Sequence, residues 1–213
     1  MAKYTTATTL QYYGTVNNPS NTTPTELSIL TQALDRAEMA FESRAGSGFI
    51  EDTFTNTHPV NPFIDGDGFL WLIAREAAPI TAVTSVSVMD MSTQPGVWQT
   101  VAWDTNNLIL PYVDTNPVRA SQEWWTCKLL PTSPSLGPKA RGKLTVKWTY
   151  KGGFASAPNS LAALICRLAW WEYKMREAPM GRIVTTELGL MELPLVIPPD
   201  VEADIKLWTR PMV

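Results

Sequence analysis

The sequence has very little of the chemistry that most catalytic and metal sites need. Its 213 residues include a single histidine, His58, and two cysteines, Cys127 and Cys166. One histidine without a C-x-x-C pair excludes the usual zinc-binding patterns. There is no G-x-S-x-G elbow or other nucleophile signature, and any Ser-His or Cys-His pair would have to use the same His58. We therefore expect no catalytic site, no metal and no cofactor.

Long apolar runs and an excess of positive charge are missing as well. No segment approaches the roughly 18 uninterrupted apolar residues of a membrane span, and the first residues do not resemble a signal peptide. The net charge is −3 and the pI about 5.2, whereas dedicated nucleic-acid readers usually carry a concentrated basic surface. We expect a soluble, cytoplasmic protein with no membrane partner. The cysteines lie in apolar settings, so buried reduced thiols are expected.

Two glycine-containing motifs look like ligand-binding loops but lack the residues that binding needs. Asp65–Gly68 (DGDG) opens like a calcium loop without the third acidic ligand or the terminal glutamate, so a hairpin turn is expected. Gly46 and Gly48, in AGSGF, have no following Lys-Ser/Thr, so they are interpreted as the end of a helix. A glycosidase would need two facing carboxylates, which a sequence cannot show.

Helical patterns stand at both ends of the chain. Residues 6–14 predict a short helix ending at Gly14. Thr23, Pro24 and Glu26 form a capping box at the start of a second helix that ends near residue 45. A third helix is predicted from near Pro158 to Pro179. We expect the apolar stripes of the second and third helices to pack together; their members are Leu30, Leu34, Ala37 and Phe41 on one, and Leu164, Leu168 and Trp171 on the other.

The middle of the chain changes to strand-like patterns rich in β-branched and aromatic residues. The expected strands are FLWLIA, ITAVTSVSVMD, VWQTVAW, LILPYV, EWWTCKLL and KLTVKWTY. The fold class is therefore α+β, with a small helical bundle bracketing a β-rich insertion. We expect residues 1–48 and 151–178 to form the helical core, residues 49–150 the β-rich insertion, and residues 179–213 an extended arm and C-terminal helix.

The segment GRIVTTELGLMELPLVIPP is apolar, aperiodic and rich in Gly and Pro, which predicts an irregular arm that needs a partner surface. A short helix restarts at Pro199 and ends in a Trp and Arg combination typical of binding hot spots. The alternative is that this helix packs back on its own bundle. The interface residues predicted here are Ile183, Leu190, Leu193, Val196, Ile205, Leu207, Trp208 and Arg210.

The order of these parts resembles one protein family. The segments that carry the resemblance are, in order, a helix ALDRAEMAFESRAGSGF, a strand APITAVTSVSVMD, a strand KLTVKWTYKGGF and a helix APNSLAALICRLAWWEYKMREAP. Their order is similar to that in the head-tail connector (adaptor) proteins of long-tailed bacteriophages, in the larger branch with a β insertion. The resemblance covers most of the chain. It does not extend to DTFTNTHPVNPFIDGDG or to the WDTNNLILPYVDTNPVRASQEWW region.

The resemblance implies a structural role in the neck of a virion that assembles in the host cytoplasm. Such proteins form a homo-oligomeric ring, usually of twelve copies, between the portal protein and a tail-side neck or stopper protein, and genomic DNA passes through the channel without sequence-specific binding. A neutral to acidic channel wall is expected, because a basic lining would retain DNA. The alternative from another class is a carbohydrate-binding β module, since Trp98, Trp103, Trp124 and Trp125 lie in the β-rich region; an enzyme is the third possibility.

Overall fold

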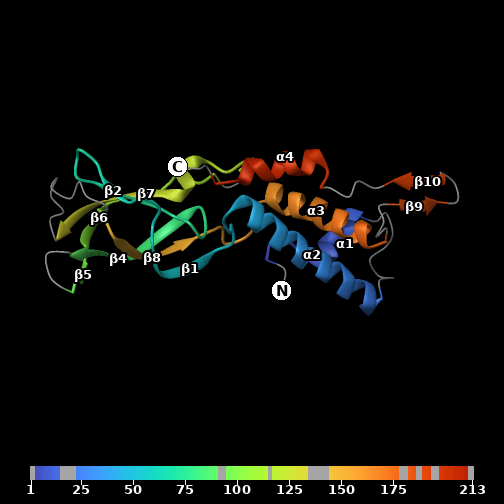
Figure 1. Ribbon diagram of the computed structural model, residues 1–213, viewed down its shortest axis with the longest axis horizontal. Helices are drawn as coiled ribbons and strands as arrows, with labels where there is room; N and C mark the ends of the chain where they lie inside the picture. The colour runs from blue at the N-terminus through green and yellow to red at the C-terminus, as the bar shows by residue number, and fades with distance from the viewer. Residues whose placement is uncertain are drawn as a thin grey trace. The chain divides into compact units, whose positions relative to one another are not determined.

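The computed structural model confirms an α+β fold, with helices at both ends of the chain and two four-stranded antiparallel sheets in the middle (Figure 1). It describes residues 3–14, 23–90, 95–114, 117–133, 144–177, 182–185, 189–192 and 197–210. The chain divides into two compact units. A helical unit comprises residues 1–45, 116–119 and 157–209, and a β unit comprises residues 46–115, 120–156 and 210–213.

The helices of the helical unit begin and end close to where the sequence predicts. Thr23 and Glu26 form the expected capping box, because the Glu26 carboxylate accepts from the Thr23 N–H at 2.9 Å and the Thr23 hydroxyl accepts from the Glu26 N–H at 3.3 Å. Gly46 ends the second helix with φ of 75°, a conformation that suits glycine. The bounds are α1 Ala7–Gly14, α2 Pro24–Ala45, α3 Asn159–Glu177 and α4 Pro199–Trp208.

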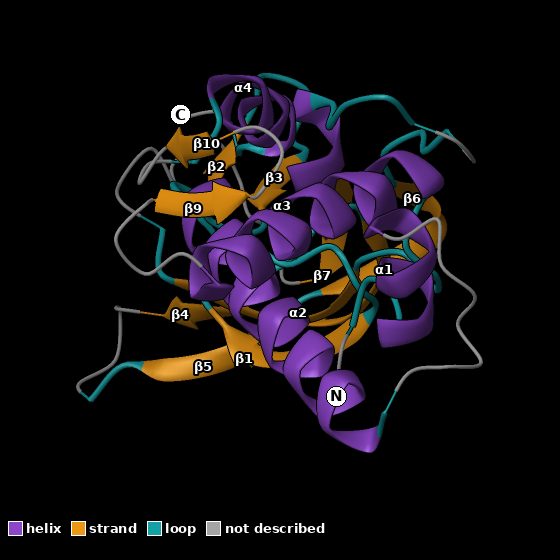
Figure 2. Ribbon diagram, turned by 90° about the vertical axis from the view of Figure 1, so that its right-hand side faces the viewer, coloured by secondary structure: helices purple, strands orange, loops and turns teal. Residues whose placement is uncertain are grey.

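The predicted pairing of the two strongest apolar stripes is confirmed, since α2 packs against α3 (Figure 2). Phe41 on α2 is fully buried, and its ring meets the edge of Tyr4 at a centroid distance of 5.8 Å. Leu27, at the start of the helix, is 43% exposed and does not belong to the buried stripe. The buried residues of this core include Leu30, Leu34, Ala37, Leu164 and Leu168.

A buried carboxylate attaches the N-terminal segment to α2. Glu38 is 5% exposed and accepts the backbone N–H of Lys3 at 2.8 Å and of Tyr4 at 2.9 Å. One turn later, Glu42 accepts from the Tyr4 hydroxyl at 2.8 Å and pairs with the Lys3 ammonium at 3.2 Å. Burial raises the pKa of Glu38 above the ordinary value for glutamate, although the N–H groups of Tyr4 and Lys3 oppose this shift.

The raised pKa of Glu38 predicts a pH-dependent stability. Because the folded state holds this proton more tightly than the unfolded state, the free energy of unfolding should fall as pH rises from glutamate's ordinary pKa to the raised value, then level off.

Two variants test this dependence. Glu38→Gln should remove the slope of the free energy of unfolding against pH, measured by urea titrations between about pH 4 and about pH 7. Glu38→Ala should lower the free energy of unfolding by about 1–3 kcal/mol, because it leaves the Tyr4 N–H without an acceptor. Glu123→Gln, at an exposed site, is the control; identical pH slopes for wild type and Glu38→Gln would contradict the prediction.

The first sheet of the β unit has the order β1-β8-β4-β5. Strand β8 alternates as its sequence predicts: Val146, Trp148 and Tyr150 are buried, while the residues between them are partly exposed. The rings of Trp148 and Tyr150 stack at 4.3 Å, and Phe54 stacks on Tyr150 at 5.2 Å. The strands are β1 Asp52–Thr57, β4 Ile80–Asp90, β5 Val97–Thr100 and β8 Val146–Gly152.

The second sheet has the order β2-β3-β7-β6, with strands β2 Phe63–Ile64, β3 Leu70–Ile73, β6 Ala102–Ile109 and β7 Thr126–Ser133. The DGDG motif forms the hairpin turn between β2 and β3, as predicted. The expected strand VWQTVAW is divided between β5 and β6, which belong to different sheets. Two further predictions that concern this sheet are wrong in detail. The EWW of the expected EWWTCKLL strand is a 3-10 helix, η2 (Gln122–Trp125), and of LILPYV only Leu108 and Ile109 are in a strand. Both of these segments line the surface described below.

Candidate functional site

Three of the predicted interface residues, Ile205, Leu207 and Trp208, lie on helix α4, and Arg210 follows it. The structure buries some of these residues and exposes others. Ile205 and Trp208 are each 2% exposed, because α4 packs against α2 and α3 through one face. Leu207 lies on the other face and is 43% exposed. Helix α4 therefore packs on its own helical bundle, as the alternative interpretation of the sequence has it. Ile205 and Trp208 are core residues in this subunit, and of the three predicted interface residues on α4 only Leu207 is exposed.

An arginine from α3 reinforces this packing. Arg167 forms ion pairs with Asp200 and Asp204, which lie one turn apart on α4. Asp200 is also in the first turn of the helix, where a carboxylate is favoured by the helix dipole. The sequence pattern predicts α4 as part of an extended arm, but these contacts attach it to the helical unit.

The rest of the predicted interface lies in the arm. Its backbone forms a hairpin of β9 (Arg182–Thr185) and β10 (Gly189–Glu192), in which Ile183 pairs with Met191 and Leu190 with Val184. An irregular arm was expected here, although Ile183, Val184 and Thr185 form a β-branched run that favours a strand. Leu193 and Val196 lie outside the described residues.

A surface that the sequence pattern does not reveal crosses the second sheet of the β unit. By strand register, Phe63 lies opposite Trp71, Trp71 opposite Lys128, and Lys128 opposite Ile109. These four side chains therefore form one row across all four strands. Phe63 and Ile109, at the two ends of this row, are 45% and 50% exposed, so the row presents large apolar side chains to solvent on both edge strands. We call these four residues the cross-strand row.

Both faces of the Trp71 ring are in contact with neighbours in this row. Phe63 stacks on it with centroids 5.3 Å apart and an interplanar angle of 16°, and the Lys128 ammonium lies 3.8 Å from its centroid. The Trp71 Nε1–H donates to Asp65 at 2.8 Å. This hydrogen bond, followed by those from the Phe69 and Asp67 N–H groups, lowers the pKa of Asp65. The turn between β2 and β3 thus fixes the orientation of Trp71.

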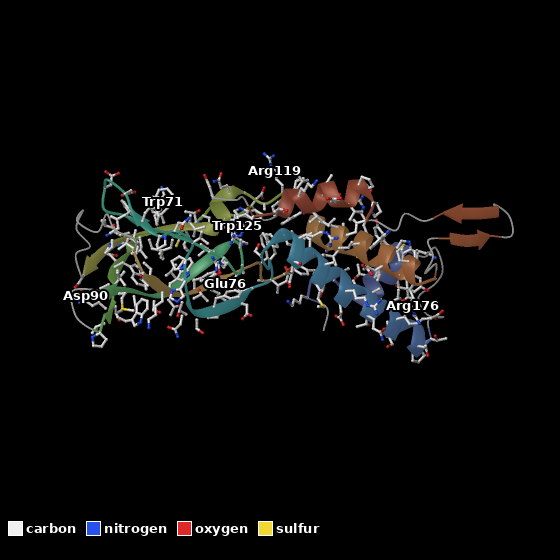
Figure 3. The ribbon with its side chains drawn as sticks, viewed as in Figure 1. Trp71, Glu76, Asp90, Arg119, Trp125 and Arg176 are labelled. Atoms are coloured by element: carbon white, nitrogen blue, oxygen red, sulfur yellow. The ribbon has the colours of Figure 1, made fainter. Side chains whose placement is uncertain are left out.

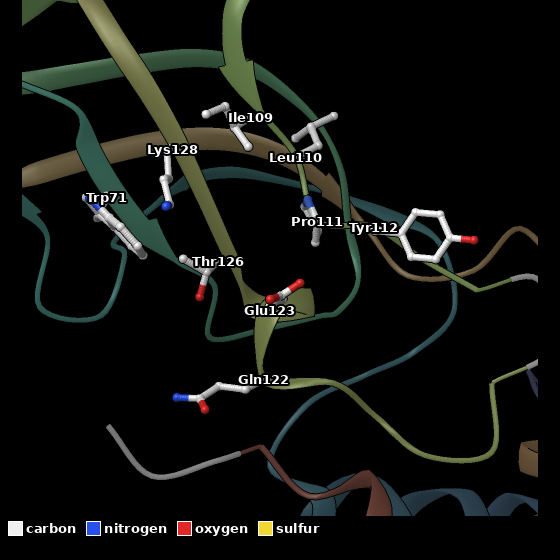
Figure 4. A pocket seen from close by; sticks show the side chains of 9 residues that line it. All are labelled: Trp71, Ile109, Leu110, Pro111, Tyr112, Gln122, Glu123, Thr126 and Lys128. Carbon is white, nitrogen blue, oxygen red and sulfur yellow. The ribbon is translucent and has the colours of Figure 1, made fainter. Parts of the chain in front are cut away.

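A groove of about 410 Å³ lies beside the row (Figure 4). Figure 4 shows Trp71 and Lys128 side by side on neighbouring strands, with Thr126 and Glu123 further along and the chain from Ile109 to Tyr112 opposite them. Tyr112 is 82% exposed. Within the described part of the chain, Lys128 and Glu123 form no ion pair. The groove is lined by Trp71, Ile109, Leu110, Pro111, Tyr112, Gln122, Glu123, Thr126 and Lys128.

Two of the four tryptophans that suggested sugar binding are buried. Trp124 and Trp125 are 2% and 1% exposed, so neither offers a ring to a ligand. Trp98 has the Lys147 ammonium 4.6 Å from its ring centroid. Stacking on a sugar needs a free aromatic face, and Trp71 in the groove has none, because Phe63 and Lys128 cover both sides.

The histidine has a backbone partner, and the two cysteines are buried thiols. His58 lies 2.7 Å from the Val146 carbonyl through its Nδ1, and the two cysteines are buried and free. Burial raises the pKa of both thiols. The described residues contain no group of three or more His, Cys, Asp or Glu side chains that could hold a metal ion. No helix among them is long and apolar enough to cross a bilayer.

The fold is similar to that of chains in phage-like particles. One is a chain from the neck of an empty GTA particle determined with C6 symmetry: 18% identity, 97% of this chain and 90% of that chain covered, TM-score 0.55. Another comes from the virion of a native gene transfer agent (GTA) particle: 20% identity, the same coverage, TM-score 0.53. The chain shares their fold. Neither a protein-family model nor a curated protein sequence matches it.

Proposed function

We propose that this protein is a structural component of the neck of a phage-like particle, located between head and tail. The observation that supports it is the fold, which is similar over 97% of the chain to a chain from a GTA neck. The same class follows from the resemblance to head-tail connector proteins. The sequence motifs and the three-dimensional fold therefore point to the same place in a particle.

More specifically, we propose an adaptor that forms a homo-oligomeric ring beneath the portal protein and offers a surface to the next neck protein on the tail side. A neck determined with C6 symmetry has its subunits arranged by rotation about one axis, and a ring of twelve copies fits that symmetry. DNA would pass along this axis. Binding between copies or to the portal would use Leu207 on α4 and the arm with Ile183, Leu190, Leu193 and Val196.

Native mass spectrometry and negative-stain imaging of the full chain, alone and with purified portal protein, test the proposal. We expect closed rings or portal-bound rings. Leu207→Glu should lower the portal-bound fraction about tenfold, because it places a charge in an apolar contact. Met39→Glu is the matched control, since Met39 is also exposed and helical, at 71%. A monomer that binds glycans and never joins portal particles would overturn the proposal.

A further inference from the structure

The second sheet of the β unit holds a second cavity, next to the groove, and two N–H donors of its lining residues have no acceptor among the described residues. Its volume is about 190 Å³. It shares Trp71, Gln122 and Thr126 with the groove, so the two hollows belong to one continuous surface. The cavity is lined by Phe63, Trp71, Ile73, Gln122, Trp125, Thr126 and Arg210.

Two of these residues carry buried N–H groups without a partner. The Arg210 Nη1 and the Trp125 Nε1 are shielded from solvent, and neither has a hydrogen-bond acceptor among the described residues. Trp125 is 1% exposed, so its indole has little access to bulk water; Figure 3 labels it together with Trp71. A buried donor without an acceptor is costly, and most such groups in proteins are satisfied by something.

The charges on this surface favour a negatively charged occupant. Arg210 lines the cavity and Lys128 lines the groove, while Glu123 is the one acidic residue among the described residues that line either. Asp65 lies nearby but uses both carboxylate oxygens to accept hydrogen bonds from Trp71, Asp67 and Phe69. A carboxylate entering the cavity would complete a charge-assisted hydrogen bond with Arg210.

The residues that line the cavity and the groove indicate which kind of molecule would carry this carboxylate. Phe63, Ile73 and the two tryptophans make the cavity largely apolar, which favours a single charge on a hydrocarbon stem over a free multiply charged ion. The adjoining groove has the exposed, apolar segment from Ile109 to Tyr112, suited to an aliphatic side chain next to the acid. Flat stacking of a sugar is disfavoured because both faces of Trp71 are covered.

We propose that this surface binds an acidic peptide segment of a partner protein, with a Glu or Asp side chain in the cavity at Arg210 and Trp125 and a neighbouring apolar side chain in the groove. Arg210 was predicted to be an interface residue in the C-terminal arm. Here it acts from the β unit, as the cation of a site that the sequence does not reveal. The inference goes beyond the proposed neck role and can be tested on the free subunit.

Nuclear magnetic resonance titration of the full chain with two synthetic peptides tests it. The probes are acetyl-Gly-Leu-Glu-Leu-Gly-amide and its Gln counterpart, and the readout is the Trp125 indole N–H signal, assigned by its loss in Trp125→Phe. We expect the Glu peptide to shift this signal and to bind about tenfold more tightly than the Gln peptide. Arg210→Gln should remove that difference. Arg119→Gln, at an exposed arginine that does not line the cavity, should retain it.

Other outcomes would overturn the proposal. Equal binding of the two peptides, or an unchanged Trp125 signal, would show that the cavity does not take a carboxylate. The same shift caused by inorganic phosphate alone would identify a small-anion site. A shift that depends on protein concentration without peptide would identify a second copy of this chain as the occupant. None of these results depends on whether the protein forms a ring.

Discussion

Gly153→Ala should leave little or no folded protein, with a loss of about 3–5 kcal/mol in the free energy of unfolding. Gly153 has φ of 104°, and a Cβ there would lie 2.3 Å from both the carbonyl carbon and the oxygen of Ile50. Those neighbours are backbone atoms, so they cannot rotate away. The close approach exists because the Glu51 N–H donates to the Phe154 carbonyl beside it, where the chain enters β1.

The control for this prediction is Gly66→Ala in the turn before β3. A Cβ at Gly66 would have no heavy atom within 4 Å, so the substitution should change stability by less than about 0.5 kcal/mol. Soluble yield and urea unfolding followed by tryptophan fluorescence measure both variants. A Gly153→Ala protein as stable as the Gly66→Ala protein would show that the end of β8 does not approach Ile50 this closely.

Phe41→Ala should cost about 3–5 kcal/mol, since it removes a fully buried ring from the contact between α2 and α3. It would also take away the edge-on partner of Tyr4 and so loosen the N-terminal segment. Thermal unfolding by circular dichroism at 222 nm follows the helices directly. We expect a clear fall in melting temperature.

Met39→Ala is the matched control on the same helix, because Met39 is 71% exposed. It should leave the melting temperature nearly unchanged. If the two variants melt together, the helix pair is not the source of the unit's stability, and the assignment of the apolar stripe on α2 is wrong.

The elements that the sequence predicts well are those whose signals are local. The capping box at Thr23 and Glu26 and the glycine at position 46 define both ends of α2 within a few residues each. The expected strand ITAVTSVSVMD coincides with β4, Ile80–Asp90. In both cases the deciding interactions join residues that are close along the chain, so the pattern alone contains them.

The candidate site could not be predicted, because it depends on strand register. Phe63, Trp71, Ile109 and Lys128 come from four strands, and no pattern in their own segments shows that they form one row. Arg210 illustrates the same limit: the residues that precede it in the sequence belong to the helical unit, but Arg210 and its cavity belong to the β unit. The stripe on α4 was visible in the sequence, whereas the surface that covers it was not.

The helical unit is built from both ends of the chain, and this affects the order in which the two units can fold during synthesis on the ribosome. Residues 46–158 separate the end of α2 from the start of α3, so α2 is synthesised long before its partner exists. Until then the apolar face with Leu34 and Phe41 has no cover from α3. The β unit can fold first, and the helices close last. We therefore expect prematurely terminated chains to expose α2 and to aggregate, even when their strands are complete.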